Sequence, residues 1–120
     1  MKIAVSSKGK DLKSPVEDRF GRSMYFVIYD TDSNSYELLE NRQDLNAPQG
    51  AGIQSASLIV KAGADVVITG HIGPKAFRVL KKAGVDVYLK NIGSISEAIE
   101  DFKSRKLKRL KEPDVKGHWM

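Results

Sequence analysis

Three runs of strand length occupy the first 40 residues, and segments with a helical period occur only after residue 50. Lys2–Ser6, Met24–Asp30 and the weaker Tyr36–Glu40 are apolar, β-branched or aromatic runs that are typical of strands. The turn residues Thr31–Ser35 join the second and third runs as a hairpin. Lys8–Arg22 contains glycines and a proline without a sustained helical period, so no helix is expected between the first two strands.

The second half of the chain alternates helices with strands. The spacing of apolar residues predicts helices over Ile53–Ala62 and Pro74–Ala83, each followed by a glycine that can end it. Asp65–Thr69 and Val85–Leu89 have the composition of buried strands. Ser94–Glu97 resembles a capping box, and a third amphipathic helix is expected behind it. The predicted order of elements is therefore β-β-β-α-β-α-β-α.

This order predicts an α/β fold. Right-handed crossovers place the fourth and fifth strands parallel to the first. The arrangement that satisfies these rules is a ribonuclease-H-like, three-layer fold with a five-stranded mixed sheet in the order 3-2-1-4-5. In that sheet only the second strand runs backwards, and helices cover both faces. A flavodoxin-like arrangement is not expected, because it needs a helix between the first two strands.

The net charge of +5 is concentrated at the C-terminal end. Residues 1–102 carry 13 basic and 13 acidic residues, whereas residues 103–120 carry seven basic and two acidic ones. We expect one domain over residues 1–105 and a basic tail over residues 106–120. Leu107 and Leu110 are three positions apart and could extend the apolar stripe of the last helix, and the alternative is a solubilising, partly frayed helix end. A neutral domain argues against a broad nucleic-acid-binding surface.

The composition also bears on location. The chain has no cysteine, which fits a reducing compartment and removes thiolates as metal ligands. No run approaches the ~20 apolar residues of a membrane span. We therefore expect a cytoplasmic protein without a membrane segment.

The predicted topology brings four loops to one edge of the sheet. They are Ser7–Ser23, Asn41–Gly52, Gly70–Pro74 and Lys90–Ser94. Open α/β sheets bind ligands at the carboxyl ends of their strands, which is the edge that these loops share. The first two loops are longer than a simple connection requires, and loops of that size are usually functional.

The stretch Gly70-His71-Ile72-Gly73-Pro74 joins a buried strand to a helix. Gly70 and Gly73 let the backbone approach a ligand closely, and the N–H groups that open the helix can bind an anion. His71 is a candidate metal ligand, cluster ligand or hydrogen-bond donor. The alternative is a tight turn that binds nothing.

The first long loop contains two arginines around an aromatic residue and a glycine. Arg19 and Arg22 offer permanent positive charge to an anionic ligand, while Phe20 is expected to form an apolar wall and Gly21 a fixed turn. The alternative is a solvated loop in which the two preceding carboxylates pair with these arginines.

Glycines also precede the other two helices. Gly50 and Gly52 can present backbone N–H groups to an anion, or they can simply let the chain turn. This loop is no P-loop, because the Gly-Lys-Ser/Thr ending is absent. Asn91 and Gly93, in the last loop, complete the set of candidate cofactor-binding residues.

Four motifs in this order resemble the dinitrogenase iron–molybdenum cofactor biosynthesis family over roughly residues 1–105. They are Asp18-Arg19-Phe20-Gly21-Arg22-Ser23, Phe26-Val27-Ile28-Tyr29-Asp30, Gly50-Ala51-Gly52-Ile53 and Gly70-His71-Ile72-Gly73-Pro74. The resemblance implies a ribonuclease-H-like fold and a small, non-enzymatic carrier. Its cargo would be an anionic iron–sulfur or iron–molybdenum type cluster, bound transiently, and its partners would include cluster-assembly proteins.

The chain departs from the family pattern at two positions. Arg19 and Gln49 stand where family members often carry histidine, so His71 is the strong side-chain ligand that remains at this edge. A loosely held cluster or another small anion fits these residues better than tight multidentate metal coordination.

Two other function classes compete with a carrier. The first is a protein- or nucleic-acid-interaction module that acts through the basic tail, although nucleic acid is the less expected partner. The second is a nuclease or other hydrolase. A ribonuclease-H-like nuclease needs carboxylates on its central strands to hold two metal ions, and Lys2–Ser6 has none.

Overall fold

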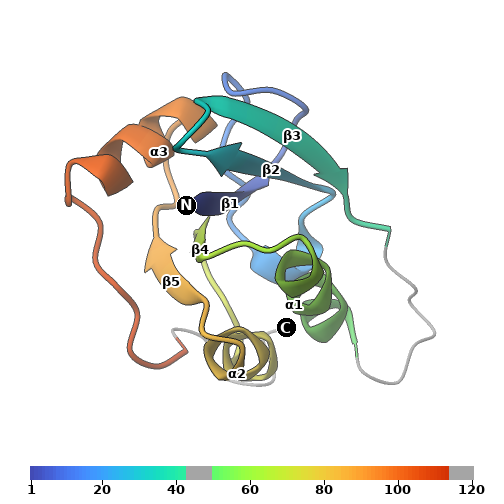
Figure 1. Cartoon of the computed structure of the whole chain (residues 1–120). Coiled ribbons are helices and arrows are strands. Elements are labelled where there is room, and N and C mark those ends of the chain that lie inside the picture. Colours follow the sequence, from blue (N-terminus) through green and yellow to red (C-terminus); the bar gives the residue numbers. More distant parts are fainter. Residues whose placement is uncertain (43–49, 114–120) are drawn as a thin grey trace.

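The computed structural model describes residues 1–42 and 50–113. Its elements follow the predicted order, with one added 3-10 turn, η1 (Figure 1). The bounds are β1 Lys2–Ser7, η1 Phe20–Arg22, β2 Tyr25–Asp30, β3 Ser35–Glu40, α1 Ala51–Lys61, β4 Val66–Thr69, α2 Pro74–Lys82, β5 Asp86–Leu89 and α3 Ile95–Lys103. Residues 43–49 of the second predicted loop, Gln49 among them, and residues 114–120 of the tail lie outside the described residues.

The five strands form one mixed sheet in the order β3-β2-β1-β4-β5. β2 pairs antiparallel with both β1 and β3, whereas β1, β4 and β5 run parallel. The predicted strand order is confirmed. The prediction that only β2 runs opposite to the other strands is confirmed as well. The ribonuclease-H-like label stays a prediction.

Helices cover both faces of the sheet (Figure 1). Alternate residues of a strand point to opposite faces, so β1 contributes to two cores. Ala4 packs with Ala56 of α1 and Leu80 of α2 in one apolar cluster, while Ile3 packs with Ile99 of α3 in the other. The predicted three-layer arrangement of helices follows from this alternation.

The chain beyond α3 does not continue as a helix. α3 ends at Lys103, Arg105 takes a left-handed φ of 59°, and residues 104–113, here called the returning segment, run back beside β5. Leu107 packs against the cluster beneath α3, whereas Leu110 packs against the cluster of α1 and α2. The expectation that both leucines extend the last helix is wrong.

Two physical reasons favour the observed path of the returning segment. A continued helix would put Arg105 and Arg109 one turn apart, where like charges repel. It would also place both leucines on one face, whereas the extended path lets them reach different layers. The N–H of Leu110 donates to the carbonyl of Val87 at 2.7 Å, which partly covers the edge strand β5.

Within residues 1–42 and 50–113, no helix has the length and apolar character that crossing a membrane requires.

Candidate functional site

The first long loop is fastened to the turn between β4 and α2. Arg19 and His71 form a parallel β-bridge, in which the N–H of Phe20 donates to the carbonyl of His71 at 3.0 Å. The N–H of His71 donates to the carbonyl of Asp18. A Cβ on Gly70 would lie 2.5 Å from that carbonyl oxygen and 2.7 Å from the Cα of Asp18. Gly70 is therefore required for the close approach of two backbones.

The same loop also touches the start of α1. The turn η1 packs against this helix, and a Cβ on Gly21 would lie 3.2 Å from both the N and the Cα of Gly52. Gly52 is buried, whereas Gly50, the N-cap of α1, is exposed and has a φ of 87°. The predicted glycines of the first and second loops thus meet backbone to backbone.

A third attachment joins the loop to the turn between β5 and α3. The N–H of Val16 donates to the carbonyl of Gly93 at 3.0 Å, and the N–H of Ile95 donates to the carbonyl of Ser14 at 2.9 Å. Gly93 has a φ of 107°, which favours glycine. The first long loop therefore contacts each of the other three expected loops along the carboxyl edge.

Buried polar side chains hold this loop from beneath. The Ser6 hydroxyl donates to the carbonyl of Glu17 at 2.8 Å and lies 2.7 Å from the Thr69 hydroxyl. The Ser23 hydroxyl accepts from the N–H of Ser7 at 3.1 Å and donates to the carbonyl of Tyr25 at 2.6 Å. These hydroxyls fix both ends of the loop against β1 and β4.

Asn41 extends this network toward α1. Its Nδ2 donates to the carbonyl of Ser23 at 2.7 Å and to the hydroxyl of Ser55 at 2.8 Å. The sequence reading missed these positioning residues. The available signal was that Ser6, Ser7 and Thr69 end apolar strands, where buried polar groups need partners.

The structure separates the candidate side chains into exposed and buried groups. Arg19, Arg22 and Asn91 are exposed, and His71 is half-buried. Phe20 is only 1% exposed, and its ring lies 5.3 Å from that of Phe26 in the core. Phe20 therefore anchors η1 instead of forming the apolar wall expected from the sequence.

The helix starts add backbone donors at this edge. Gly50 and Gly73 are the N-caps of α1 and α2, and glycine has no side chain with which to cap the first turn. The first N–H groups of a helix have no partner inside it, and they carry partial positive charge. With Arg19 and Arg22, the edge combines fixed and partial positive charges, which suits an anion.

A hollow of about 420 Å³ adjoins this edge between the end of β3 and α1. Arg42 and Lys61 contribute positive charge to it, Glu40 contributes negative charge, and Asn41 connects it to the buried network. Arg19 and His71 do not line this hollow. The hollow lies beside the candidate site and is not part of it.

The donor set favours an anion over a chelated metal. Among the described residues, no three His, Asp or Glu side chains lie together as a metal site, and the chain has no cysteine. His71 can supply one imidazole nitrogen. Guanidinium and backbone N–H groups at this edge bind anionic oxygen or sulfur and not metal ions, while the nearby Glu17 carboxylate accepts from the N–H of Arg19 at 3.5 Å.

Comparisons with known proteins agree with this fold. The model of a family described as dinitrogenase iron–molybdenum cofactor matches residues 1–105. An uncharacterized protein of Methanocaldococcus jannaschii is 39% identical over 113 residues, which cover 92% of each chain.

Two solved structures are similar over nearly the whole chain. The apo form of the orange protein from Desulfovibrio gigas has a TM-score of 0.89 and 33% identity, covering 95% of this chain and 96% of that chain. A Thermotoga protein described as belonging to the DUF35 family has a TM-score of 0.80 and 37% identity, covering 95% and 97%.

Proposed function

Because the chain belongs to the dinitrogenase iron–molybdenum cofactor family, we propose that it is a non-enzymatic carrier of a small anionic metal cluster. The cargo is an iron–sulfur or iron–molybdenum type cluster, or a precursor of one, that the chain holds transiently and exchanges with cluster-assembly proteins. The similarity to the orange protein, whose structure is described as an apo form, supports a role in holding a cofactor. A cytoplasmic location is part of the proposal, since a chain without cysteine fits a reducing compartment.

The observation that carries this proposal is the junction of Arg19 with His71. The β-bridge between these residues holds the backbone of an arginine next to the backbone of a histidine. Backbone hydrogen bonds on both sides of the bridge make the arrangement rigid before any cargo arrives. Preorganised donors bind better because less conformational freedom is lost on binding.

The residues present fit a cluster held as a whole anion. Such a cluster keeps its own sulfide bridges and terminal ligands, so it needs no thiolate from the chain. Arg19, Arg22 and the first N–H groups of α1 and α2 supply charge and hydrogen bonds, and His71 supplies one donor or ligand. Binding through charge and hydrogen bonds also suits release to another protein.

A hydrolase is the weaker proposal. The central strand β1 carries no carboxylate, and Asp65 precedes β4 at the opposite edge of the sheet. The Oδ2 of Asp65 accepts from the N–H of Lys2 at 2.8 Å, so this carboxylate joins β1 to β4 far from the glycine-rich turns. We expect carefully purified protein to leave an RNA–DNA hybrid intact in the presence of magnesium.

An anaerobic titration tests the carrier directly. Purified chain is mixed with a synthetic thiolate-ligated iron–sulfur cluster or with isolated iron–molybdenum cofactor, and visible absorption follows binding. We expect a saturable spectral change that competes with other polyvalent anions. If each mixture gives only the sum of the spectra of the free chain and the free cluster, without saturation for either cluster, the carrier proposal is refuted.

A further inference from the structure

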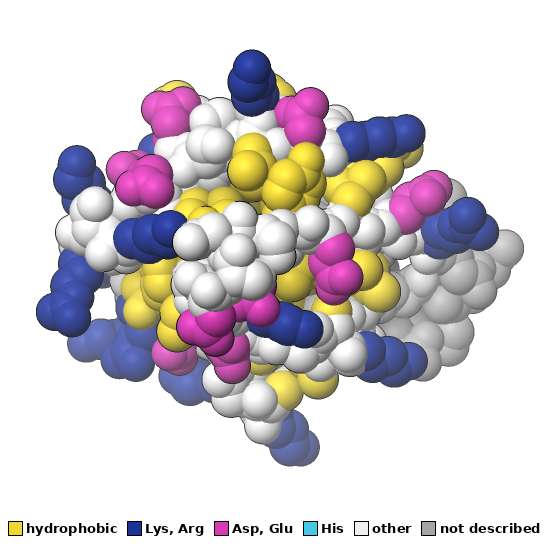
Figure 2. Space-filling model, turned by 45° about the horizontal axis from the view of Figure 1, so that its top comes forward, with side chains coloured by type: hydrophobic (Ala, Val, Ile, Leu, Met, Phe, Trp, Pro, Cys, Tyr) yellow, Lys and Arg dark blue, Asp and Glu magenta, His cyan; other side chains and the backbone are white. Residues whose placement is uncertain are grey.

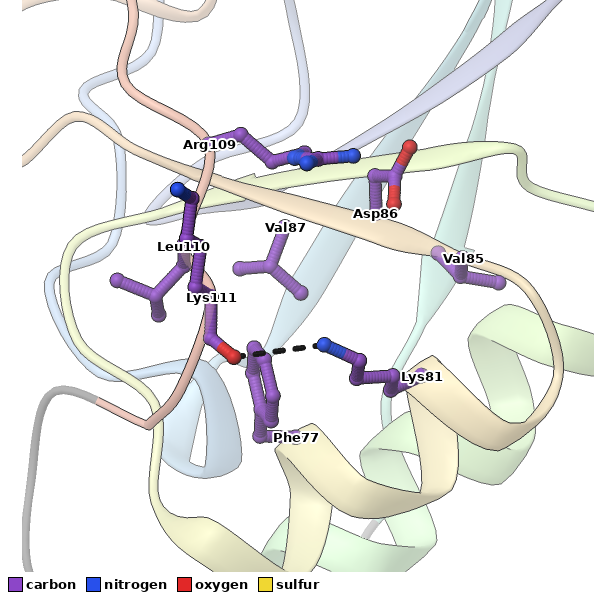
Figure 3. Close-up of a pocket in the computed structure, with 8 residues that line it drawn as sticks. All are labelled: Phe77, Lys81, Val85, Asp86, Val87, Arg109, Leu110 and Lys111. Carbon is purple, nitrogen blue, oxygen red and sulfur yellow. Dashed lines mark hydrogen bonds between the residues drawn. The ribbon is translucent and has the colours of Figure 1, made fainter.

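A second concave surface lies between α2 and the returning segment. One cavity of about 130 Å³ has an apolar floor that includes Phe77, Val87 and Leu110 (Figure 3). A larger one of about 480 Å³ continues past Lys81 toward Pro113. The two cavities share Phe77 and Lys81, and together they are called the cationic cleft.

Positive charge dominates the rim of the cationic cleft. Five of its lining residues are basic and only Asp86 is acidic. The basic residues are Arg78, Lys81 and Lys82 of α2 and Arg109 and Lys111 of the returning segment. In Figure 3 the side chain of Arg109 extends toward Asp86, while Lys81 reaches toward the backbone of Lys111, so one acidic residue balances only part of the positive charge of the rim.

Backbone and apolar contacts hold the returning segment beside β5 and α2. The Leu110 N–H donates to the carbonyl of Val87 at 2.7 Å, and the side chain of Leu110 packs on the core. The Nζ of Lys81 donates to the carbonyl of Lys111 at 3.4 Å across the cleft (Figure 3). These contacts hold the segment that carries Arg109 and Lys111 beside α2, where its basic side chains can pair with an anionic occupant.

We propose that the cationic cleft binds an acidic peptide segment of a partner protein. Carboxylates of the peptide pair with the basic rim, and one apolar side chain enters the smaller cavity. A volume of 130 Å³ equals about four waters at their liquid volume of roughly 30 Å³ each, which suits a single aliphatic side chain. Arg19 and His71 line neither cavity, although Pro74, at the end of the Gly70–Pro74 loop, lines the larger one.

A peptide fits this surface better than a nucleic acid. Basic side chains gather on one side of the molecule, the side of residues 103–111, while acidic and basic side chains alternate elsewhere on the face in Figure 2. Nucleic acids favour a long basic track that contacts many phosphates. A short cleft with an apolar floor offers few such contacts and instead accommodates a side chain.

Fluorescence anisotropy with a labelled peptide of alternating Glu and Leu tests the proposal. We expect saturable binding that weakens as salt rises, because exposed charges are screened. A matched peptide with Gln in place of Glu should not bind, and one with Ser in place of Leu should bind less tightly. The double variant Lys82→Gln with Arg109→Gln should weaken binding roughly 5- to 10-fold.

The variant Lys61→Gln is the matched control, since this exposed lysine at the end of α1 lies outside the cleft. It should bind the peptide like the original chain. Unchanged affinity in the folded double variant, equal binding of the Gln peptide, or tighter binding of a single-stranded oligonucleotide would each overturn the proposal. Cluster binding by the double variant should stay unchanged, so this proposal and the carrier fail independently.

Discussion

At the scale of single residues, the glycines of the carboxyl edge serve close packing of backbone on backbone. Gly70 has no room for a Cβ because the backbone of Asp18 lies against it. Gly21 meets Gly52 in a similar but looser way. Both contacts position the first long loop against its neighbours at the candidate site.

Gly70→Ala is expected to destabilise the fold by about 2–4 kcal/mol, because the new methyl group would collide with fixed backbone. Gly84→Ala is the control, since Gly84 has open space but a φ of 80°. This control should cost only about 1 kcal/mol. Urea unfolding of both variants measures the difference. Equal losses of unfolding free energy would show that the first long loop shifts to make room for the methyl group.

If the chain carries a cluster as proposed, we expect Arg19 and His71 to contribute to cluster binding more than to the stability of the fold. Removing one charge-assisted hydrogen bond costs about 1.5–3 kcal/mol. Arg19→Ala or His71→Ala should therefore weaken cluster binding roughly 10- to 150-fold with little change in the free energy of unfolding. Arg105→Gln, at an exposed arginine beyond the far end of α3, is the matched control. Unchanged affinity in both alanine variants would leave the backbone groups as the binders.

At the scale of elements, the turn after β5 is tied to α3 at both ends of the helix. Ser94 and Glu97 form the capping box predicted from the sequence, with hydrogen bonds of 3.1 and 3.2 Å. The Nζ of Lys90 lies 2.8 Å from the Oδ2 of Asp101, near the end of α3. These contacts fix the turn that carries Gly93, to which the first long loop is bonded.

The ion pair of Lys90 and Asp101 makes stability depend on pH. The hydrogen bond from Lys90 lowers the pKa of Asp101 below its ordinary value of 3.8, desolvation opposes this, and the charges of Lys90 and Lys106 add to it. A lowered carboxyl pKa stabilises the fold above 3.8, and this contribution is lost as pH falls through the folded value.

The variant Asp101→Asn should thus show a smaller rise of unfolding free energy with pH in the window just below pH 3.8. Chemical unfolding at a series of acidic pH values measures that slope. Glu37→Gln, at an exposed carboxylate of β3, serves as the comparison. An identical slope in the original chain and in Asp101→Asn would contradict the pairing.

At the scale of the whole molecule, two surfaces carry positive charge. One is the glycine-rich carboxyl edge, and the other is the cationic cleft beside α2. The returning segment belongs to the packed structure as well as to the cleft, since Leu107 and Leu110 reach the two cores.

Leu110→Ala should therefore lower the free energy of unfolding by about 1–2 kcal/mol, because the half-buried side chain leaves the apolar cluster of α1 and α2. Lys108→Ala, two residues earlier and exposed, should change it by less than about 0.5 kcal/mol. Thermal or urea unfolding compares the two. If both variants unfold like the original chain, the returning segment does not stabilise the domain.

The sequence predicted what local patterns encode. Strand alternation, helical period and the short crossovers were enough for the strand order and for the helices on both faces. The return of residues 104–113, the burial of Phe20 and the network of Ser6, Ser23 and Asn41 depend on contacts between distant segments. The periodicity within a segment carries no information about such contacts. A basic run with two leucines is compatible with a helix end as well as with an extended segment that packs on the core.

The central claim is that an anionic cluster binds at the junction of the first long loop with the starts of α1 and α2. Backbone amide spectra of nitrogen-15-labelled chain, recorded anaerobically with and without an iron–sulfur cluster, test this most directly. We predict shifted or broadened signals at Asp18–Arg22, Gly52 and His71–Gly73, with the hairpin turn at Thr31–Asn34 unchanged. Changes confined to that hairpin, or none at saturating cluster, would contradict the account.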